Sequence, residues 1–397
     1  METYEDKSQS KLFTLKRILI ITRESRDEIK NPTFGGPRLV KELYKQLTTK
    51  GFKVSVLSVF DLGALSAHLL RIRGKDASRS RTSFPDVAKL RWFLNLLYSL
   101  IVEMLSYIDT KLQKEIRKRI DERTPDIILY NGPIGAFAFL NIARKRSIPF
   151  VLCEHNVDYY FYEDKLGHNP LINVYKAIEL SVCKAADLVI CFNPYDRERL
   201  AKDGVSSEKI IVWKFNAQAE RSCDKENILS RIPLAIRSRI ENKFVVGFLG
   251  ANYTLNIIAV KYILKISEKL PKDIVFLIIG SVAEAFKGVK VSSNVIFTGY
   301  VEDVKPYLAI TNVLLNLKFT SDTGIEAKMF DYLSCGKLII STRIGAVGFE
   351  HFPNIIIVDN LKDAVREIVR LYREWSTKIK SKTRGLALMG RDLYGEV

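Results

Sequence analysis

The sequence predicts an α/β protein built from two Rossmann-like, doubly wound domains that face each other across a cleft. Short β-branched runs alternate with helical patterns, which is typical of parallel sheets with helices on both faces. The pattern occurs twice, once in each half, and 397 residues exceed what one hydrophobic core usually supports. Ligands of such folds bind at the carboxyl ends of the strands, where we expect the functional residues.

The strand predictions divide the chain nearly in half. In the first half, strands are predicted at 17–22, 53–58, 126–130, 150–153, 188–191 and 210–213. In the second half, they are predicted at 244–249, 275–279, 295–297, 313–316, 337–341 and 355–358. The polar stretch 217–227 has neither period and is the predicted linker. We therefore expect an N-terminal Rossmann-like domain at 1–216 and a C-terminal Rossmann-like domain at 228–397.

The segment 65–123 is a predicted insertion between the second and third strands. It begins with a basic stretch and continues as a helical pattern from Lys89 to about Ile120. An apolar helix face next to basic residues is able to lie on a membrane surface; a core helix with a solvated basic loop is the alternative. The predicted face consists of Trp92, Phe93, Leu96, Leu97 and Leu100.

Composition narrows the class of protein. The 62 basic and 45 acidic side chains give a net charge of +17, which favours anionic partners such as nucleotides or lipid phosphates. Residues 1–10 do not resemble a secretory signal, and no uninterrupted apolar run is long enough to span a membrane. We expect a cytoplasmic protein, with the cytoplasmic membrane face as a possible location. Five cysteines without a C-x-x-C pair indicate reduced thiols and no zinc site.

Two motifs in the first half follow predicted strands. Gly35 and Gly36 open a helix, and bare backbone at a helix start is able to hold a phosphate, although an ordinary structural turn remains open. His155 directly follows a strand and is a candidate hydrogen-bond donor to a sugar hydroxyl or developing oxyanion; a locally satisfied histidine is the alternative. Neither G-x-G-x-x-G nor a Walker A sequence occurs, which argues against dehydrogenases and ATPases.

The second half contains two similar strand ends. Gly250 and Asn252 lie in the turn of FLGANYTLN and are candidates for donor binding, with an ordinary turn between strand and helix as the alternative. Gly299, Val301 and Glu302 follow a later strand, where bare backbone is able to read the edge of a nucleobase.

The segment 323–342, TGIEAKMFDYLSCGKLIIST, is the most specific element. We expect its polar turn at Thr323 and Gly324 to start a helix that carries Lys328 and Asp331 on one face. A helix N-terminus contributes about 0.3–2 kcal/mol toward an anion, whereas two unit charges 4 Å apart near a surface interact by about 4 kcal/mol. Lys328 is therefore the predicted diphosphate ligand and Asp331 the predicted ribose ligand; a solvated Lys–Asp pair is the alternative. No D-x-D occurs, so we expect neither a metal nor a cofactor.

With these motifs, the chain from about 17 to 359 resembles the large retaining glycosyltransferase family known as glycosyl transferases group 1, whose fold is GT-B and which includes the family 4 enzymes. The similar motifs are the GG turn, PDIIL, EHN, AADLVICFN, FLGANYTLN, FTGYVEDV and DYLSCGKLIIST. The resemblance implies that 1–216 is the acceptor-side domain and 228–397 the nucleotide-sugar-binding domain. It also implies donor or acceptor contacts for Gly35 and Gly36, a position beside the transferred sugar for His155, and nucleotide binding by Lys328 and Asp331. The family's first acid is replaced by Thr323, unless Glu326 substitutes for it.

The sequence therefore predicts metal-independent transfer of a sugar from a nucleoside-diphosphate donor to a glycan or lipid-linked acceptor, with retention of configuration. His155 and Lys328 are the predicted catalytic residues. A sugar-nucleotide epimerase of the same architecture and a non-catalytic nucleotide-sugar-binding protein are the alternatives. We expect no nucleic-acid partner, because basic residues are not interleaved with aromatic ones along a groove-like element.

Overall fold

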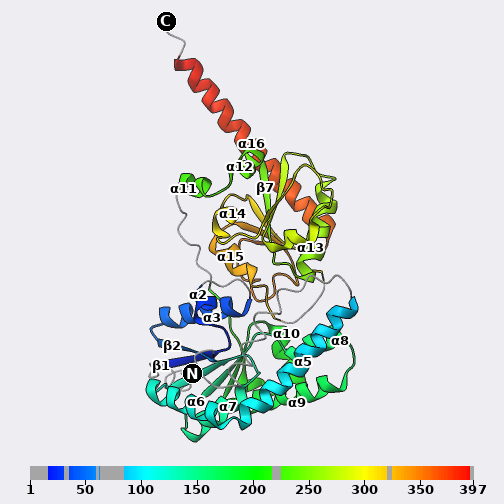
Figure 1. Ribbon diagram of the computed structural model, residues 1–397. Coiled ribbons are helices and arrows are strands. Elements are labelled where there is room, and N and C mark those ends of the chain that lie inside the picture. The colour runs from blue at the N-terminus through cyan, green and yellow to red at the C-terminus, as the bar shows by residue number, and fades with distance from the viewer. Residues whose placement is uncertain are drawn as a thin grey trace, which may run out of the picture. The chain divides into compact units, whose positions relative to one another are not determined.

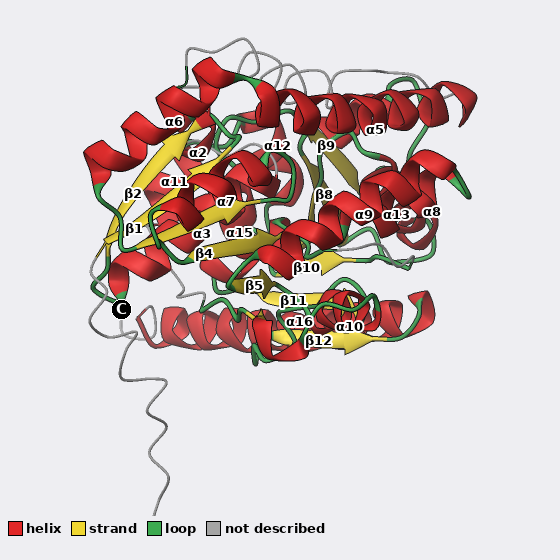
Figure 2. Ribbon diagram, turned by 90° about the horizontal axis from the view of Figure 1, so that it is seen from below, coloured by secondary structure: helices red, strands yellow, loops and turns green. Residues whose placement is uncertain are grey.

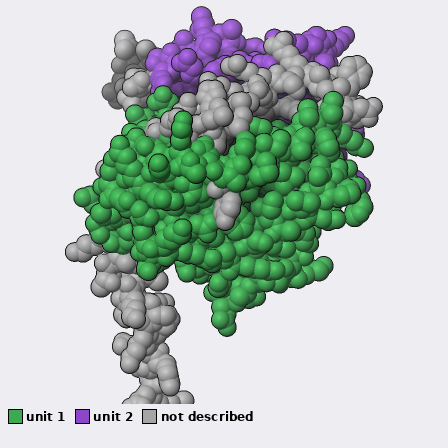
Figure 3. All heavy atoms as spheres, turned by 60° about the horizontal axis from the view of Figure 1, so that its bottom comes forward, with its two compact units in different colours: residues 1–216, 322–327 green, residues 217–321, 328–397 purple. Residues whose placement is uncertain are grey.

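The computed structural model describes residues 17–30, 35–59, 62, 85–216, 225–319 and 324–393. The chain divides into two compact units, which Figure 3 distinguishes by colour. Unit 1 consists of residues 1–216 together with 322–327, and unit 2 of residues 217–321 together with 328–397. A short piece of the second half of the sequence therefore belongs to the first unit.

Unit 1 is a six-stranded parallel sheet with the strand order β2-β1-β3-β4-β5-β6. Its strands are β1 (Arg17–Thr22), β2 (Lys53–Ser58), β3 (Ile127–Asn131), β4 (Phe150–Glu154), β5 (Leu188–Cys191) and β6 (Ile210–Val212). Its helices are α2 (Arg26–Lys30), α3 (Gly35–Thr49), α5 (Pro85–Ile108), α6 (Thr110–Arg123), α7 (Ala136–Lys145), α8 (Asp158–Leu166), α9 (Pro170–Ala185), α10 (Pro194–Lys202) and the short η2 (Ser207–Lys209). Figure 1 shows the helices around this sheet in blue to green.

Unit 2 is a second six-stranded parallel sheet, with the order β12-β11-β10-β7-β8-β9. Its strands are β7 (Phe244–Leu249), β8 (Ile274–Ile279), β9 (Val295–Gly299), β10 (Val313–Asn316), β11 (Leu338–Thr342) and β12 (Ile355–Val358). Its helices are α11 (Lys225–Ser230), α12 (Leu234–Ile240), α13 (Thr254–Ser267), η3 (Ser281–Phe286), α14 (Lys305–Ala309), α15 (Lys328–Ser334) and α16 (Leu361–Leu393).

The twelve predicted strands all occur, within one or two residues at each end. The reason is burial on both sides: β3, β4, β8 and β10 have no exposed residue. Strands buried on both faces are continuous apolar runs, which the sequence displays plainly. Of the predicted linker 217–227, residues 217–224 lie outside the described residues. Its last three residues, 225–227, are the first three of α11.

The predicted helical pattern from Lys89 to about Ile120 is confirmed, but it is interrupted. The chain forms two helices, α5 and α6, divided at Asp109. The Asp109 carboxylate accepts hydrogen bonds from the backbone N–H groups of Lys111 at 2.9 Å and Leu112 at 3.0 Å. This side chain caps the second helix, since an N-cap carboxylate satisfies N–H groups that lack partners in the first turn.

The predicted membrane face of this segment is wrong for most of its residues. Leu96 is fully buried, Leu100 packs against the core of unit 1, and Trp92 makes an edge-to-face contact with Phe161 at 5.0 Å between ring centroids. The named face therefore turns inward, and of these residues only Leu97 is exposed. Among the described residues, no helix combines the length and apolar character that crossing a membrane requires.

Candidate functional site

In unit 1, the carboxyl ends of β1, β3 and β4 bring three polar side chains together. Thr22 ends β1, Asn131 ends β3, and His155 follows β4. The Asn131 amide donates to Thr22 Oγ1 at 3.2 Å, and its carbonyl oxygen contacts His155 Nε2. Because an amide oxygen only accepts, Nε2 of His155 carries the proton in this arrangement, and Nδ1 is the acceptor of the neutral ring.

The imidazole of His155 is held in its neutral form. Burial lowers the pKa of His155 to about 3, and the nearby positive charge of Arg23 acts in the same direction. Both effects disfavour a charged ring. At neutral pH, His155 is therefore a hydrogen-bonding group rather than a proton donor with a pKa suited to acid catalysis.

Two ionisable residues from the loop after β1, Arg23 and Glu24, lie close to this histidine. Glu24 accepts hydrogen bonds from Thr22 and, at 3.3 Å, from the Asn131 amide. Burial raises the pKa of Glu24 above its ordinary value, against the opposing effect of Arg23. A Cβ at Gly132 would lie 3.4 Å from the Arg23 guanidinium, at a backbone φ of +89°. Position 132 thus favours glycine beside the Arg23 side chain.

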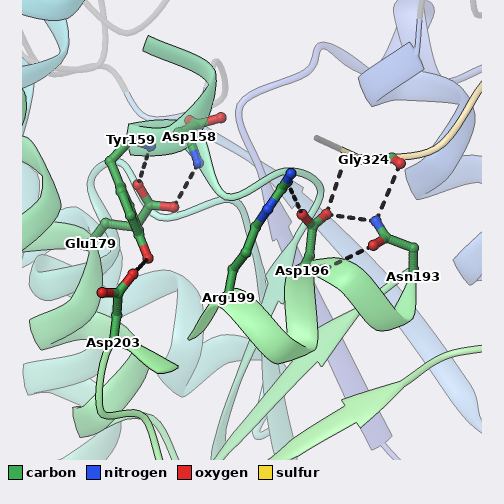
Figure 4. A network of polar contacts seen from close by, with 8 residues as sticks. All are labelled: Asp158, Tyr159, Glu179, Asn193, Asp196, Arg199, Asp203 and Gly324. Carbon is green, nitrogen blue, oxygen red and sulfur yellow. Dashed lines mark hydrogen bonds and ion pairs between the residues drawn. The ribbon is translucent and has the colours of Figure 1, made fainter. Parts of the chain in front are cut away.

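Within unit 1, Gly324 is bound to the start of α10 through both of its backbone polar groups. Its N–H donates to Asp196 Oδ2 at 3.0 Å, and its carbonyl accepts from Asn193 Nδ2 at 3.2 Å (Figure 4). Asn193 is the N-cap of α10. Asp196 forms an ion pair with Arg199, with 3.1 Å between Asp196 Oδ1 and Arg199 Nη1. Burial raises the pKa of Asp196, although these hydrogen bonds and Arg199 oppose the shift.

No side chain other than hydrogen fits at position 324. Gly324 has a φ of +83°, and a Cβ there would lie 1.9 Å from Asn156 Oδ1 and 2.8 Å from the His155 carbonyl oxygen. Gly324 therefore packs directly against the loop that carries His155. Of the other two predicted residues nearby, Glu326 is half-buried in the same segment, and Thr323 lies outside the described residues.

A buried acidic network continues from this loop, as Figure 4 shows. Glu179 of α9 accepts from the backbone N–H groups of Asp158 at 2.8 Å and Tyr159 at 3.0 Å, and so caps the start of α8. The Tyr159 hydroxyl donates to Asp203. Glu154, the residue before His155, is fully buried, and burial raises its pKa well above the ordinary value. These contacts fix the backbone that follows β4.

In unit 2, the ends of β7, β8 and β9 approach each other as bare backbone. Gly280 has a φ of +102°, and a Cβ there would lie 2.5 Å from the Gly250 carbonyl oxygen. The Gly280 N–H donates to the Gly299 carbonyl at 3.0 Å, and the Asn252 N–H donates to Ser281 Oγ at 3.0 Å. The predicted residues Gly250, Asn252 and Gly299 therefore belong to one connected turn region. Val301 and Glu302 follow β9, the first half-buried and the second exposed.

Lys328 joins this turn region from α15. Its ammonium donates to Asn256 Oδ1 at 2.8 Å and lies 4.6 Å from the centre of the Phe248 ring. The Asn256 amide in turn donates to the Ala251 carbonyl at 3.0 Å. Asn256 thus connects the Lys328 ammonium to the turn after β7, while the aromatic face of Phe248 stabilises the cation.

The position of α15 is fixed by Tyr332. This fully buried side chain accepts from the Leu249 N–H at 2.8 Å and donates to the Leu315 carbonyl at 3.1 Å. The expectation that the turn at Gly324 starts the helix is wrong, because α15 begins at Lys328. The Gly324 N–H is instead bound by Asp196, as described above. Asp331, half-buried, lies one turn beyond Lys328.

The remaining predicted pair, Gly35 and Gly36, forms the first two residues of α3, as the sequence suggests. The polar residues that orient the predicted ones were not themselves predicted, and Asn131, Asp196 and Asn256 are examples. Asn131 was recognisable as a polar residue that ends an apolar strand. Asp196 and Asn256 lie within helices and acquire their contacts through tertiary packing, for which the sequence carries no local signal.

Family models match both units. The model of Glycosyltransferase Family 4 matches residues 35–214, and that of Glycosyl transferases group 1 matches residues 243–374. The chain belongs to this group of glycosyltransferases. No curated protein matches the sequence significantly.

Solved structures are similar to this glycosyltransferase over nearly its whole length. Anabaena Alr3699/HepE in complex with UDP is 13% identical, with 89% of each chain covered and a TM-score of 0.55. Sucrose-phosphate synthase from Thermosynechococcus elongatus is 13% identical, covering 96% of this chain and 100% of that chain, with a TM-score of 0.55. A glycosyltransferase from Rickettsia africae ESF-5 is 15% identical, covering 90% and 88%, with a TM-score of 0.53. The predicted GT-B class of fold is confirmed.

Proposed function

We propose that this glycosyltransferase transfers a sugar from a nucleoside-diphosphate donor to a glycan or lipid-linked acceptor at the cytoplasmic face of a membrane, with retention of configuration and without a metal. The placement of the Lys328 ammonium beside the glycine turns after β7 and β8 carries the proposal. A cation next to bare backbone at the carboxyl ends of parallel strands suits a diphosphate. The Anabaena protein, which has a similar fold, was solved with UDP and with UDP-glucose.

In the proposed reaction, the bond between the anomeric carbon and the diphosphate oxygen breaks, and a bond from the acceptor oxygen to that carbon forms on the same face. The acceptor proton passes to the departing diphosphate. Lys328 neutralises the negative charge that develops on this leaving group, and such preorganised electrostatic stabilisation supplies most of the rate. The absence of a D-x-D sequence favours a reaction in which Lys328 and backbone N–H groups replace a metal.

The neutral His155 ring would contact the transferred sugar as a hydrogen-bond partner. Its pKa of about 3 keeps the ring uncharged, and Asn131 fixes its orientation. Asp331, three residues after Lys328, would accept hydrogen bonds from the two ribose hydroxyls. The glycines Gly250 and Gly299 would allow the nucleotide to approach the backbone closely.

The test compares Lys328→Ala with Lys261→Ala, an exposed lysine of α13 in the same unit. Each protein is incubated with radiolabelled nucleotide sugars, candidate acceptors and a metal chelator, and transferred sugar and released diphosphate are measured. We expect turnover to fall at least 100-fold in Lys328→Ala, as when one stabilising donor is lost, and to be unchanged in Lys261→Ala. Full activity of Lys328→Ala would refute the assignment of the diphosphate.

The same incubation separates the alternative functions. An epimerase yields an altered donor without free diphosphate, and a binding protein yields neither product with any acceptor. Calorimetric titration with nucleoside diphosphates tests Asp331. Weaker binding by Asp331→Asn at constant folded fraction supports the ribose contact, and equal affinity argues against it.

A further inference from the structure

The helix α5 is apolar on both its inner and its outer side. Its inner side packs against α7, α8 and α9, as the secondary-structure view in Figure 2 also indicates. Its outer side carries six large apolar residues that are 37–60% exposed: Leu90, Leu94, Leu97, Ile101, Met104 and Ile108. We name these six residues the α5 stripe.

The spacing of the α5 stripe makes it continuous. Its residues follow one another at intervals of four, three, four, three and four, which places them on one side of a helix. At 1.5 Å per residue, the stripe is about 27 Å long. A helix that is apolar all round is normally covered on all sides, and a continuous exposed patch of this kind marks an interaction surface.

The stripe itself carries no charge. Between Trp92 and Ile108 the only ionisable carboxylate or cation is Glu103, which is 6% exposed and faces inward. Together with the buried Ser99 and Ser106, it places a few polar groups among the apolar residues of the inner side, and these groups are unsuited to lipid. The helix therefore has the chemistry to lie on an apolar phase rather than to cross it.

Cationic residues follow the stripe along the chain. The next helix, α6, exposes Lys111, Lys114, Arg117 and Lys118, and none of these four forms an ion pair with a described residue. Positive charge beside an apolar helical stripe attracts anionic headgroups.

We propose that the α5 stripe docks on a membrane surface that contains anionic lipid. A second copy of this chain is the other occupant that the heptad-like spacing suits. Electrostatic repulsion disfavours this second occupant. Self-association through the stripe would bring together the basic residues of two chains, each with a net charge of +17. The proposal does not depend on the transferase reaction, and its test uses no activity measurement.

The test measures binding to vesicles of phosphatidylcholine with and without phosphatidylglycerol, by flotation of the full chain. Wild type is compared with Leu94→Gln/Ile101→Gln/Met104→Gln, and with a control that removes exposed apolar residues elsewhere, Val174→Gln/Leu234→Gln. We expect the stripe variant to bind anionic vesicles at least tenfold more weakly than both. Raising salt from about 0.1 M to about 1 M shortens the Debye length from about 10 Å to about 3 Å, and should weaken wild-type binding.

A second variant keeps the stripe apolar and reports how deeply the stripe enters the lipid bilayer. In Leu94→Trp, we expect the added fluorescence to shift to the blue on anionic vesicles and to be quenched by brominated acyl chains. Vesicle binding that is equal in wild type and in the stripe variant overturns the proposal. The proposal is also overturned if wild type fails to bind vesicles but forms a dimer in sedimentation velocity, and the stripe variant does not form that dimer. Unchanged circular dichroism of each variant excludes unfolding as the cause.

Discussion

Glu103 offers the sharpest quantitative test of how unit 1 is assembled. This carboxylate on α5 is 6% exposed and accepts a hydrogen bond from the Gly135 N–H at the start of α7, while its other oxygen has no hydrogen-bond partner among the described residues. Burial raises the pKa of Glu103 to about 7, although the N–H groups of Gly135 and Phe137 and the charge of Arg23 oppose the shift. The desolvation of the Glu103 carboxylate therefore raises its pKa by more than the hydrogen bonds from the start of α7 lower it.

The sign and size of the pH dependence follow from this shift. A glutamate has a pKa of about 4.3 when unfolded, so between the two pKa values the folded chain binds more protons than the unfolded chain. Stability is then lost as pH rises through the folded pKa. For Glu103, with a folded pKa of about 7, the linkage relation gives a loss of about 2 kcal/mol between about pH 5.5 and about pH 8.5.

The perturbation is Glu103→Gln, which keeps an oxygen that accepts from Gly135 and removes the titration. The control is Glu198→Gln, an exposed residue of α10. Urea unfolding is followed by tryptophan fluorescence in a Trp375→Phe background, because the two tryptophans that remain lie in unit 1. The fluorescence signal then reports the unfolding of unit 1 alone, because a chain of two units need not unfold in a single transition.

We expect the free energy of unfolding of the parent and of Glu198→Gln to change by the same amount over this pH range. Glu103→Gln should lack the loss of about 2 kcal/mol that Glu103 contributes. Equal pH slopes in all three proteins would refute the claim that Glu103 is held in a desolvated site.

Two further predictions use the same unfolding assay on unit 1. Gly324→Ala should destabilise it more than Gly51→Ala: both carry the cost of a left-handed backbone, about 1–2 kcal/mol, but only position 324 adds an overlap with Asn156. Equal losses would contradict the described packing. Since the pKa of His155 is lowered to about 3, the contribution of His155 to stability should fall by about 2 kcal/mol as pH falls from about 7.5 to about 5, because the unfolded histidine takes up the proton. This contribution is the difference between the parent and His155→Gln, because the titration of Glu103 acts in the opposite direction. His155→Gln should lack this dependence, and an unchanged slope would place the titration elsewhere.

The sequence predicted the strands far better than the helical insertion. Strands such as β8 are buried throughout, so their apolar runs identify them without tertiary information. In the insertion, apolar residues occur on every side of α5, and periodicity does not tell which of them face the core. Trp92 and Leu100 were therefore assigned to the surface although they pack inward. The divide at Asp109 was an overlooked capping signal, since an Asp before a helix is a common start.

The predicted site residues lie at strand ends or in the turns and helices that follow them, because glycine turns after apolar runs are visible in sequence. The partners that orient them were not visible. Asn131 is 24 residues from His155, and Asp196 is 128 residues from Gly324. Such contacts depend on which strand ends are neighbours in the sheet. A local sequence pattern does not reveal the order of the strands. The GT-B resemblance supplied the fold but no positions for these partners.

The two units present different chemistry at their strand ends. In unit 1, burial shifts the pKa of His155 down and those of Glu24, Glu154 and Asp196 up, in each case toward the uncharged form. In unit 2, Lys328 is stabilised as a cation by an amide oxygen and an aromatic face. Uncharged hydrogen-bonding groups suit sugar hydroxyls, whereas a cation suits a diphosphate. We therefore infer that variants of the unit 1 cluster alter the choice of sugar or acceptor, while variants of Lys328 weaken every nucleotide-sugar donor alike.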